Sequence, residues 1–364
     1  MGDRFLVATR KGLFTFRRGA GGGWQQSDLA FLGEPVSFAL SDARDGSLYA
    51  ALNLGHFGVK LHRATNGGGF KEIAAPHFPE QPESHDDPTP WSVQQIWSLA
   101  AGGDGEAGLI WAGTIPGGLF RSTDCGDSWE LVESLWNRPD RLSWSGGGYD
   151  YPGIHSICVD PRDSRQLTLA ISIGGVWRSE DAGQSWEPRT EGMFAVYVPP
   201  DLRADPNSQD PHRLVQSPSH PEVFWAQHHN GVFRSVDAGI SWREISGVSP
   251  SVFGFAVEVH PSDPETAWFV PAVKDECRVP VDGKLVVSRT RDGGETFEVL
   301  RDGLPQTHAY DLIYRHALAV DETGDRLVMG STTGSLWVSE NQGDSWECIT
   351  TQLPPVAAVH FAAA

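Results

Sequence analysis

A short turn sequence recurs along almost the whole of this chain of 364 residues. Five copies carry most of a Ser-x-Asp-x-Gly-x-Ser/Thr-Trp box, at residues 122–129, 179–186, 235–242, 290–297 and 339–346. Two eroded copies keep only the glycine and the closing aromatic residue, Gly21 with Trp24 and Gly67 with Phe70. The closing aromatic residues follow one another at intervals of 46 to 59 residues. Repeats of this length predict an architecture with one supersecondary unit per repeat.

Each box has a structural role that follows from its residue types. The Asp and Ser side chains bond to local backbone amides, the glycine supplies a positive φ, and the aromatic residue anchors the turn against a sheet. Short apolar runs with a Gly-containing loop between them precede each box, as in residues 109–114 and 118–122, and such runs are typical of strands. The box therefore indicates one four-stranded blade per repeat and carries no catalytic information.

The boxes resemble the Asp-box (BNR) repeats of sialidases, sortilin, xyloglucanases and the photosystem II assembly factor, over almost the whole chain. The resemblance implies an all-β fold, a single seven-bladed β-propeller that spans residues 1–364. Sialidases have an early Arg-Ile-Pro motif, whereas here residues 8–14 read Ala-Thr-Arg-Lys-Gly-Leu-Phe and no such motif follows. We therefore expect that the chain is not a genuine sialidase, since a fold alone does not fix a function.

The two ends of the chain are expected to share one blade. The chain opens on the apolar run at residues 4–9, and residues 356–364 have the composition of an innermost strand with no blade after it. Closure of the ring predicts a first blade made of residues 356–364 and 3–30, which leaves no open sheet edge.

Composition restricts the partners. The 41 Gly and 25 Pro suit a turn-rich domain, and no apolar run approaches the roughly 20 residues that cross a bilayer. The N-terminus lacks a signal sequence, and the four cysteines have no metal-ligand or redox spacing, so we expect a cytoplasmic protein without a membrane partner. A formal net charge of −19 argues against nucleic acid. Oligomeric state is left open.

A histidine recurs at one position of the expected innermost strands when these are aligned on the turn that follows each of them. Four strands carry it, as His155, His212, His316 and His360, while three others offer Trp97, Phe255 and Ser37. Innermost strands surround the propeller axis, so equivalent positions lie at one height around it. Imidazoles that converge there would bind a divalent transition metal, with Fe, Mn, Zn and Cu not distinguished. The alternative is that these histidines bond to backbone and water and plug the channel.

Other candidates lie in the loops at the same mouth. His228 and His229 are the best candidates for acid/base work, Asp150, Asp311 and Glu276 could orient imidazoles, and Tyr151 could donate to a substrate oxygen. Aromatic residues in long loops suggest walls of a pocket. We expect Arg213 and Arg315 to form salt bridges between blades in the first instance and to clamp substrate in the second, and His85-Asp86-Asp87 to be a solvated turn.

Three function classes fit these residues. The first is a metal-dependent enzyme, an oxygenase or a hydrolase/lyase, that acts on a small anionic or aromatic substrate in the axial pocket. The second is a metal-independent Asp-box glycoside hydrolase or lyase, which needs two carboxylates roughly 5–10 Å apart, with Asp150 and Glu276 as the nominated pair. The third is a non-catalytic binding or assembly propeller.

Overall fold

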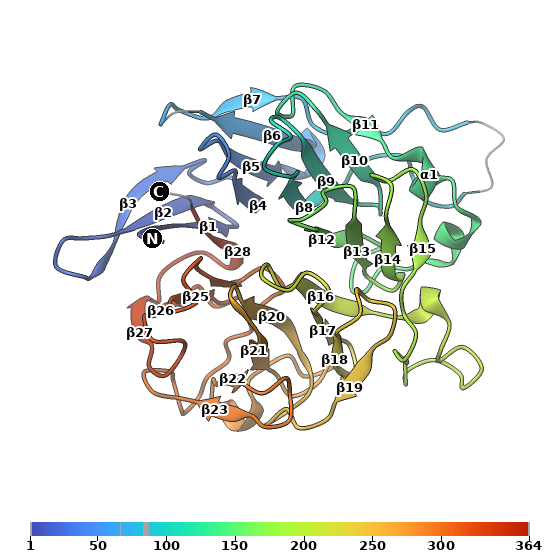
Figure 1. Cartoon of the computed structure of the whole chain (residues 1–364). Helices are drawn as coiled ribbons and strands as arrows, with labels where there is room; N and C mark the ends of the chain where they lie inside the picture. The colour runs from blue at the N-terminus through green and yellow to red at the C-terminus, as the bar shows by residue number, and fades with distance from the viewer. Residues whose placement is uncertain (1, 66, 83–86, 363–364) are drawn as a thin grey trace.

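Seven four-stranded antiparallel sheets form a ring in the computed structural model, which describes residues 2–65, 67–82 and 87–362 (Figure 1). The innermost strands are β4 (Val36–Ser41), β8 (Gln95–Ala101), β12 (Ile154–Val159), β16 (Pro211–Gln216), β20 (Gly254–His260), β24 (Leu318–Val320) and β28 (Val356–Phe361). The second strands are β1 (Arg4–Thr9), β5 (Leu48–Asn53), β9 (Ile110–Ile115), β13 (Leu167–Ile171), β17 (Phe224–His228), β21 (Asp263–Pro271) and β25 (Leu327–Gly330).

The outer half of each blade consists of a third strand and a short edge strand. The third strands are β2 (Gly12–Arg18), β6 (Val59–Ala64), β10 (Leu119–Ser122), β14 (Gly175–Ser179), β18 (Gly231–Ser235), β22 (Val287–Thr290) and β26 (Leu336–Ser339). The edge strands are β3 (Trp24–Ala30), β7 (Lys71–Ile73), β11 (Glu130–Leu131), β15 (Glu187–Pro188), β19 (Arg243–Ile245), β23 (Glu298–Leu300) and β27 (Glu347–Thr350). The described helices are short: α1 (Glu133–Trp136), η1 (Gly55–Phe57), η2 (Pro139–Ser143), η3 (Pro206–Ser208) and η4 (Val281–Gly283). None of the helices in the described ranges is long and apolar enough to cross a bilayer.

The ring is closed by the last strand, as the sequence predicts. Strand β28 pairs antiparallel with β1, with Leu6 opposite His360 and Val7 opposite Val359. Strand β28 also contacts its two neighbours around the axis, β4 and β24. The first blade therefore combines residues 356–361 with residues 4–30, and the seven-bladed all-β fold is confirmed.

The boxes form the turns expected of them. In the first complete copy, Asp124 Oδ1 accepts hydrogen bonds from the Ser122 hydroxyl (2.7 Å) and from the Ser128 amide (2.9 Å). Gly126, with φ of 87°, lets its own amide donate to Ser122 Oγ at 2.8 Å. The closing Trp129 donates from its indole nitrogen to the carbonyl of Ala74, in the preceding blade. Trp242 makes the same kind of contact, to the carbonyl of Arg189, so these two turns each fix a blade against the one before it.

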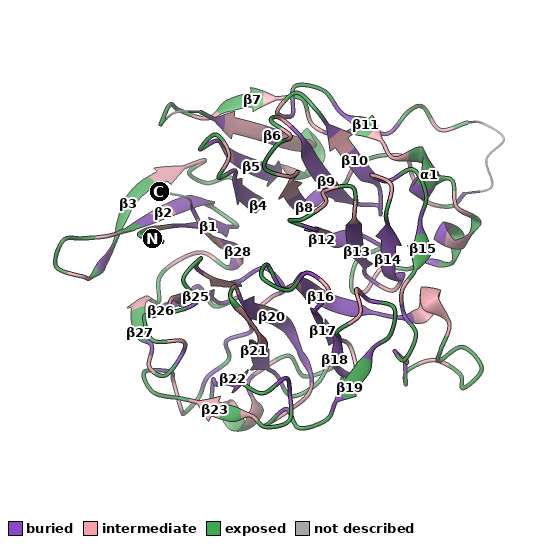
Figure 2. Ribbon diagram, viewed as in Figure 1, coloured by how far each residue is buried: buried purple, intermediate pink, exposed green. Residues whose placement is uncertain are grey.

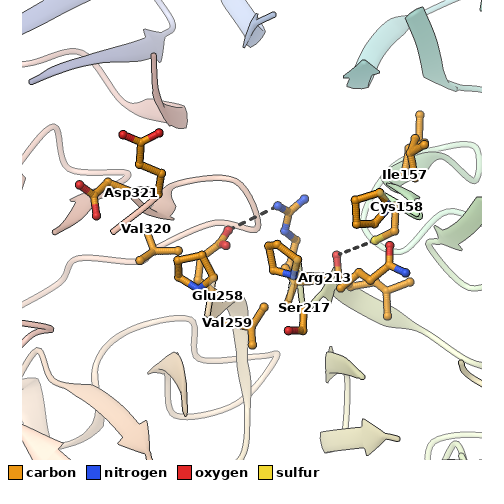
Figure 3. A pocket seen from close by; sticks show the side chains of 16 residues that line it. Ile157, Cys158, Arg213, Ser217, Glu258, Val259, Val320 and Asp321 are labelled. Carbon is orange, nitrogen blue, oxygen red and sulfur yellow. Dashed lines mark hydrogen bonds and ion pairs between the residues drawn. The ribbon is translucent and has the colours of Figure 1, made fainter. Parts of the chain in front are cut away.

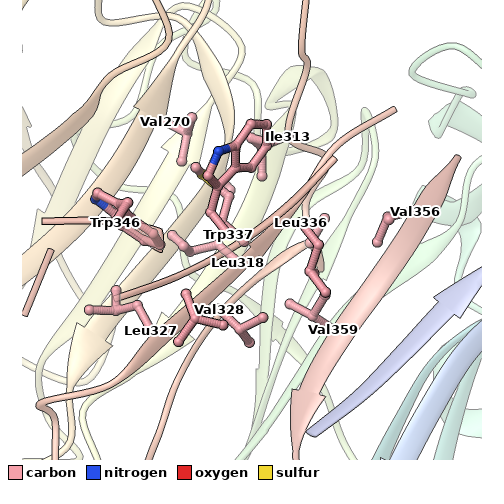
Figure 4. Packing of buried hydrophobic residues seen from close by; sticks show 14 of the residues in the cluster. Val270, Ile313, Leu318, Leu327, Val328, Leu336, Trp337, Trp346, Val356 and Val359 are labelled. Carbon is pink, nitrogen blue, oxygen red and sulfur yellow. The ribbon is translucent and has the colours of Figure 1, made fainter. Parts of the chain in front are cut away.

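Apolar side chains fill the spaces between blades, and the innermost and second strands are largely buried (Figure 2). Around the last blade, Leu318, Val328 and Trp337 pack with Val359 of β28 and Val270 of the preceding blade (Figure 4). At roughly 25 cal/mol per Å² of apolar surface removed from water, such interfaces supply most of the stabilisation. The blades accordingly depend on one another.

On five of the innermost strands, the aligned position coincides with a break in strand register. The pairing of β4, β8, β12, β16 and β20 with the second strands is irregular across Ser37, Trp97, His155, His212 and Phe255, respectively. Bulges of this kind re-aim the side chain of the extra residue. The repeated bulge is the structural basis of the aligned position on these five strands. On β28 the break in register falls at Ala357, while His360 pairs regularly with Leu6, so the alignment is wrong for His360.

Candidate functional site

The four aligned histidines do not gather around one point. Within the described ranges, only one group of three or more side chains brings its metal-binding atoms within 4.8 Å of one another, and it consists of Asp210, His212 and His229. Of the predicted ligands His155, His212, His316 and His360, it contains His212 alone. The predicted four-histidine centre is therefore not formed in the described part of the chain.

The physical reason is that backbone groups engage two of these imidazoles and the hydroxyl of an adjacent residue engages a third. His316 donates from Nε2 to the carbonyl of His155 at 2.7 Å, and His360 bonds to the backbone of Ser41. His155 lies against the Ser156 hydroxyl through Nδ1, at 3.0 Å. Burial lowers the pKa of all three, to about 4 for His360, so the rings are neutral near pH 7.

The two histidines predicted for acid/base work have different surroundings. His228 is fully buried at the end of β17, and its Nε2 accepts the amide hydrogen of Asp210 at 3.0 Å. Burial lowers the pKa of His228 to about 3, so the ring is neutral near pH 7. Because the side chain is fully buried, it has no solvent-facing nitrogen for proton transfer, and its role is to hold the backbone of Asp210 in place. The next residue, His229, has a side chain that is 24% exposed, with Nδ1 at 3.3 Å from Asp210 Oδ2. Only His229 of the two can meet a ligand.

The remaining predicted side chains are not among the described residues that line the cavity on the propeller axis. Asp150 is exposed and Tyr151 half-buried, while Gly147, Gly148 and Tyr149 of the same loop line the axial cavity. Glu276 is exposed beside Lys274, at 3.5 Å. Asp311 accepts hydrogen bonds from Ser331 and Thr333 rather than from an imidazole. The nominated pair, Asp150 and Glu276, is thus not among the residues that line the cavity.

One turn is buried where solvation was expected. His85 and Asp86 lie outside the described residues, but Asp87 is 6% exposed and pairs with Arg141 at 2.5 Å. The indole nitrogen of Trp91 also donates to Asp87, at 3.1 Å. The expectation of a solvated turn is therefore wrong at Asp87, which anchors the entering loop of the third blade.

A cavity of about 930 Å³ opens on the axis at the mouth where these loops gather. Three arginines line it, Arg10, Arg278 and Arg315, and three aromatic side chains, Trp97, Tyr149 and Tyr314, form part of its wall. Neutral polar groups come from Asn53, Gln95 and Thr332. None of the described residues that line it is Asp or Glu. In a chain with net charge −19, this cavity is a local concentration of positive charge.

Arg315 is the most unusual of these residues. It is 6% exposed, and neither its Nε nor its Nη2 has a hydrogen-bond partner. Its guanidinium lies 4.8 Å from the ring centre of Trp97 and 5.4 Å from that of Phe255. Burial lowers its pKa, an effect that attraction to Asp210 partly offsets. The expected salt bridge between blades is therefore wrong for Arg315, since no ion pair to it is found in the described part of the chain.

Arg213 shows the behaviour that was expected of both arginines. It reaches Glu258 of the next innermost strand at 3.4 Å, and the two line a smaller cavity of about 450 Å³ at the opposite ends of the strands (Figure 3). Burial raises the pKa of Glu258, while Arg213 acts against this. Asp321 and Glu322 also line this second mouth, so its described lining carries more acids than bases. In the axial cavity, Arg278 pairs with Asp275 at 2.5 Å, while Arg315 has no ion pair within the described ranges.

The group formed by Asp210, His212 and His229 adjoins the axial cavity. An ideal Cβ placed on Gly147, which lines the cavity, would lie 3.2 Å from Asp210 Oδ1. Phe255 connects the two sites as well, because His212 stacks on its ring at 4.4 Å and both Arg315 and Arg278 lie over it. Sequence analysis missed Asp210, which differs from other loop acids only in standing two residues before an aligned histidine.

No known protein-family model matches the chain. It is 26% identical over 195 residues to a xyloglucanase from Paenibacillus sp, an alignment that covers 48% of this chain and 18% of that protein. The chain thus spans less than a fifth of the curated relative it matches.

Two solved structures share the fold. The GH74 xyloglucanase from Xanthomonas campestris superposes with a TM-score of 0.61 at 17% identity, covering 94% of this chain and 54% of that chain. YCF48 bound to D1 peptide superposes with a TM-score of 0.55 at 14% identity, and the superposition covers 93% of this chain and 89% of YCF48. The resemblance to xyloglucanases and to the photosystem II assembly factor is thereby confirmed at the level of the propeller.

Proposed function

We propose that the axial cavity binds a carboxylate-bearing carbohydrate or a similar small, ring-shaped anion. The observation that carries this proposal is the buried guanidinium of Arg315, which lacks both a carboxylate partner and hydrogen bonds from Nε and Nη2 among the described residues. Burying an unpaired charge is costly, and a carboxylate ligand would remove much of that cost.

The chain itself shows how such a contact is made. Arg18 donates from Nε and Nη2 to the two carboxylate oxygens of Glu340, each at 2.7 Å. Arg315 has the same two nitrogens unpaired, and bidentate pairing of this kind is among the strongest that arginine forms. Because both nitrogens are shielded from solvent, the carboxylate must displace part of the wall. Gly147 and Gly148 line the same cavity and have no side chain to move.

The rest of the cavity suits a carbohydrate ring. Tyr149 is 46% exposed and packs edge-on against Trp97, with ring centres 5.0 Å apart. Aromatic faces with a few neutral hydrogen-bonding groups, here Asn53, Gln95 and Thr332, are typical of small-molecule sites. Arg10, which is exposed at the mouth, would draw an anion toward the cavity, whereas Arg278 is already paired with Asp275 at 2.5 Å.

Calorimetric titration with D-galacturonate and D-glucuronate, against D-galactose and D-glucose, tests the proposal. We expect the uronates to bind at least tenfold more tightly than the neutral sugars and Arg315→Met to lose at least tenfold in affinity for them. Arg213→Met, which alters the other mouth, is the matched control and should bind normally. Equal binding of acidic and neutral sugars, or unchanged uronate binding by Arg315→Met, would refute the proposal.

Hydrolysis of a glycan is the second candidate, and the likeness to proteins named xyloglucanase favours it. A metal-independent hydrolase needs two convergent carboxylates, and the described lining of the axial cavity supplies none. Release of reducing sugar from xyloglucan would support this candidate.

A binding platform is the third candidate, and the likeness to YCF48 bound to D1 peptide favours it. It predicts that an acidic peptide competes with uronate for the cavity and that no turnover of either compound occurs. The comparisons give no support to an oxygenase.

A further inference from the structure

We propose that Asp210, His212 and His229 bind one divalent first-row transition-metal ion beside the axial cavity. The proposed ligands are Asp210 Oδ2, His212 Nε2 and His229 Nδ1, whose atoms lie within 4.8 Å of one another. This site goes beyond the proposed anion site, shares none of its arginines, and stands or falls independently of it.

The distances fit a shared ion better than they fit hydrogen bonds. Asp210 Oδ2 lies 3.5 Å from His212 Nε2 and 3.3 Å from His229 Nδ1. Charge-assisted hydrogen bonds between such groups are about 2.7–2.9 Å long. Two ligands that each lie about 2.1 Å from a tetrahedral ion are roughly 3.4 Å apart. The carboxylate oxygen and each imidazole nitrogen therefore have the spacing of neighbouring ligands.

The orientation of His212 points in the same direction. Its Nδ1 lies 2.7 Å from the carbonyl oxygen of Gly254, and a carbonyl can only accept, so Nδ1 carries the proton. In the neutral ring, Nε2 then turns its lone pair toward the Asp210 carboxylate. A cation between these two atoms would convert a repulsive contact into two coordination bonds.

The surroundings supply what a metal-bound imidazole needs. A backbone carbonyl that accepts from the second ring nitrogen, as Gly254 does, is the usual means of fixing the tautomer and orientation of a ligand histidine. The ring of His212 is further held by stacking on Phe255, and the bulge in β16 aims it. His228 accepts from the Asp210 amide and so holds the backbone of the carboxylate ligand.

The cluster also has an unpaired atom and a route of entry. Asp210 is 3% exposed, and its Oδ1 has no hydrogen-bond partner. His229, which is partly exposed, provides access from solvent past Tyr197, whose ring centre is 4.6 Å away. Three protein ligands leave positions for water or for a ligand oxygen, as in catalytic rather than structural sites.

Chelator-treated, metal-free protein titrated with Zn²⁺ by calorimetry, and with Co²⁺ followed by visible absorption, tests this site. We expect one equivalent of Zn²⁺ to bind to the wild type, with Co²⁺ giving d–d bands typical of imidazole and carboxylate ligands. His229→Ala and Asp210→Asn should each weaken Zn²⁺ binding at least tenfold. The second substitution keeps the shape of the side chain, and the first removes a partly exposed ring, so both variants should fold.

His220→Ala is the control for adventitious binding by a surface imidazole, because His220 is exposed on the turn after β16. It should bind Zn²⁺ as the wild type does. Absence of saturable binding, or one-equivalent binding that His229→Ala retains, would overturn the assignment and leave a proton between Asp210 and His212 as the explanation. Arg315→Met should bind Zn²⁺ as the wild type does. If this variant loses uronate binding but keeps Zn²⁺ binding, the two proposals are shown to concern separate sites.

Discussion

Replacing Arg315 by methionine should stabilise the propeller while abolishing anion binding. The guanidinium is 6% exposed, lines a cavity without a carboxylate among its described residues, and leaves Nε and Nη2 without hydrogen bonds. Methionine preserves much of the side-chain volume and brings no charge to desolvate. A residue retained at a cost to stability is the kind found at binding sites.

The magnitude follows from opposing contributions. Removing an ion from water costs several kcal/mol even after relaxation. The contacts of the guanidinium with the rings of Trp97 and Phe255 stabilise the folded state by about 0.5–2 kcal/mol each and so offset part of this desolvation cost. Attraction to Asp210 offsets a further part. We therefore expect Arg315→Met to raise the free energy of unfolding by about 1–2 kcal/mol. An unfolding entropy of about 2.1 cal/mol/K per residue converts this to a Tm increase of roughly 1–3 °C.

Differential scanning fluorimetry at pH 7, with Arg213→Met as the matched variant, measures the effect. Arg213 is also largely buried beside an aligned histidine, but it pairs with Glu258, whose side chain is 15% exposed. Removing it strands a carboxylate and should lower stability by about 2–3 kcal/mol, somewhat less than for a fully buried pair. The two substitutions should thus shift Tm in opposite directions. A decrease in Tm for Arg315→Met as large as that for Arg213→Met would refute the view that Arg315 lacks a compensating partner.

Three further outcomes are expected. Trp186→Ala removes the closing aromatic of a box, 3% exposed, and should cost about 3–5 kcal/mol in denaturant unfolding, so unchanged stability would contradict the anchoring role of the box. Deleting residues 355–364 removes β28, leaves β1 unpaired on one side and should abolish the cooperative thermal transition, whereas a folded truncated protein would show that closure is dispensable. Asp124 has its pKa lowered to about 2, chiefly by the Ser128 hydroxyl, so its stabilisation is present above about pH 4 and lost as pH falls toward 2. Asp124→Asn should therefore show a smaller fall in Tm between pH 4 and 2 than the wild type, and an identical fall would contradict this reasoning.

The chain contains its own precedent for the last substitution. Asn341 occupies the aspartate position of the seventh box, where its Oδ1 accepts from the Ser339 hydroxyl and from the Ser345 amide at 2.9 and 3.0 Å. The turn consequently forms without a charge. Asparagine at position 124 should for that reason leave Tm at pH 7 nearly unchanged.

The fold could be predicted because local chemistry repeats. Each box combines a side-chain oxygen that accepts from the turn with a glycine of positive φ and a large aromatic, so each copy specifies the same turn wherever it occurs. Closure could be predicted as well, because a propeller needs four strands in every blade and residues 4–30 supply only three for the first. Neither inference depends on knowing a contact between distant residues.

The site could be predicted only in part, because it depends on contacts between blades. The alignment found the position occupied by His212, and adjacency to blade five singled out His228 and His229 together, of which only His229 faces Asp210 with a partly exposed ring. The sequence did not reveal that Arg315 would meet Trp97 and Phe255 instead of an acid. Nor did it reveal Asp210, since which loop carboxylate turns toward a given imidazole is set by tertiary packing.

What separates His212 from the other aligned histidines is the use made of its second nitrogen. In each of His212 and His316, one ring nitrogen donates to a backbone carbonyl at 2.7 Å, which ties one strand to another. Only His212 then turns its remaining nitrogen toward a carboxylate that a partly exposed imidazole also approaches. His155 also has a buried Nε2 without a partner, but no carboxylate joins it in a ligand group among the described residues. A histidine at the aligned position can therefore join two segments of the chain or face a carboxylate, and the acid two residues upstream decides which.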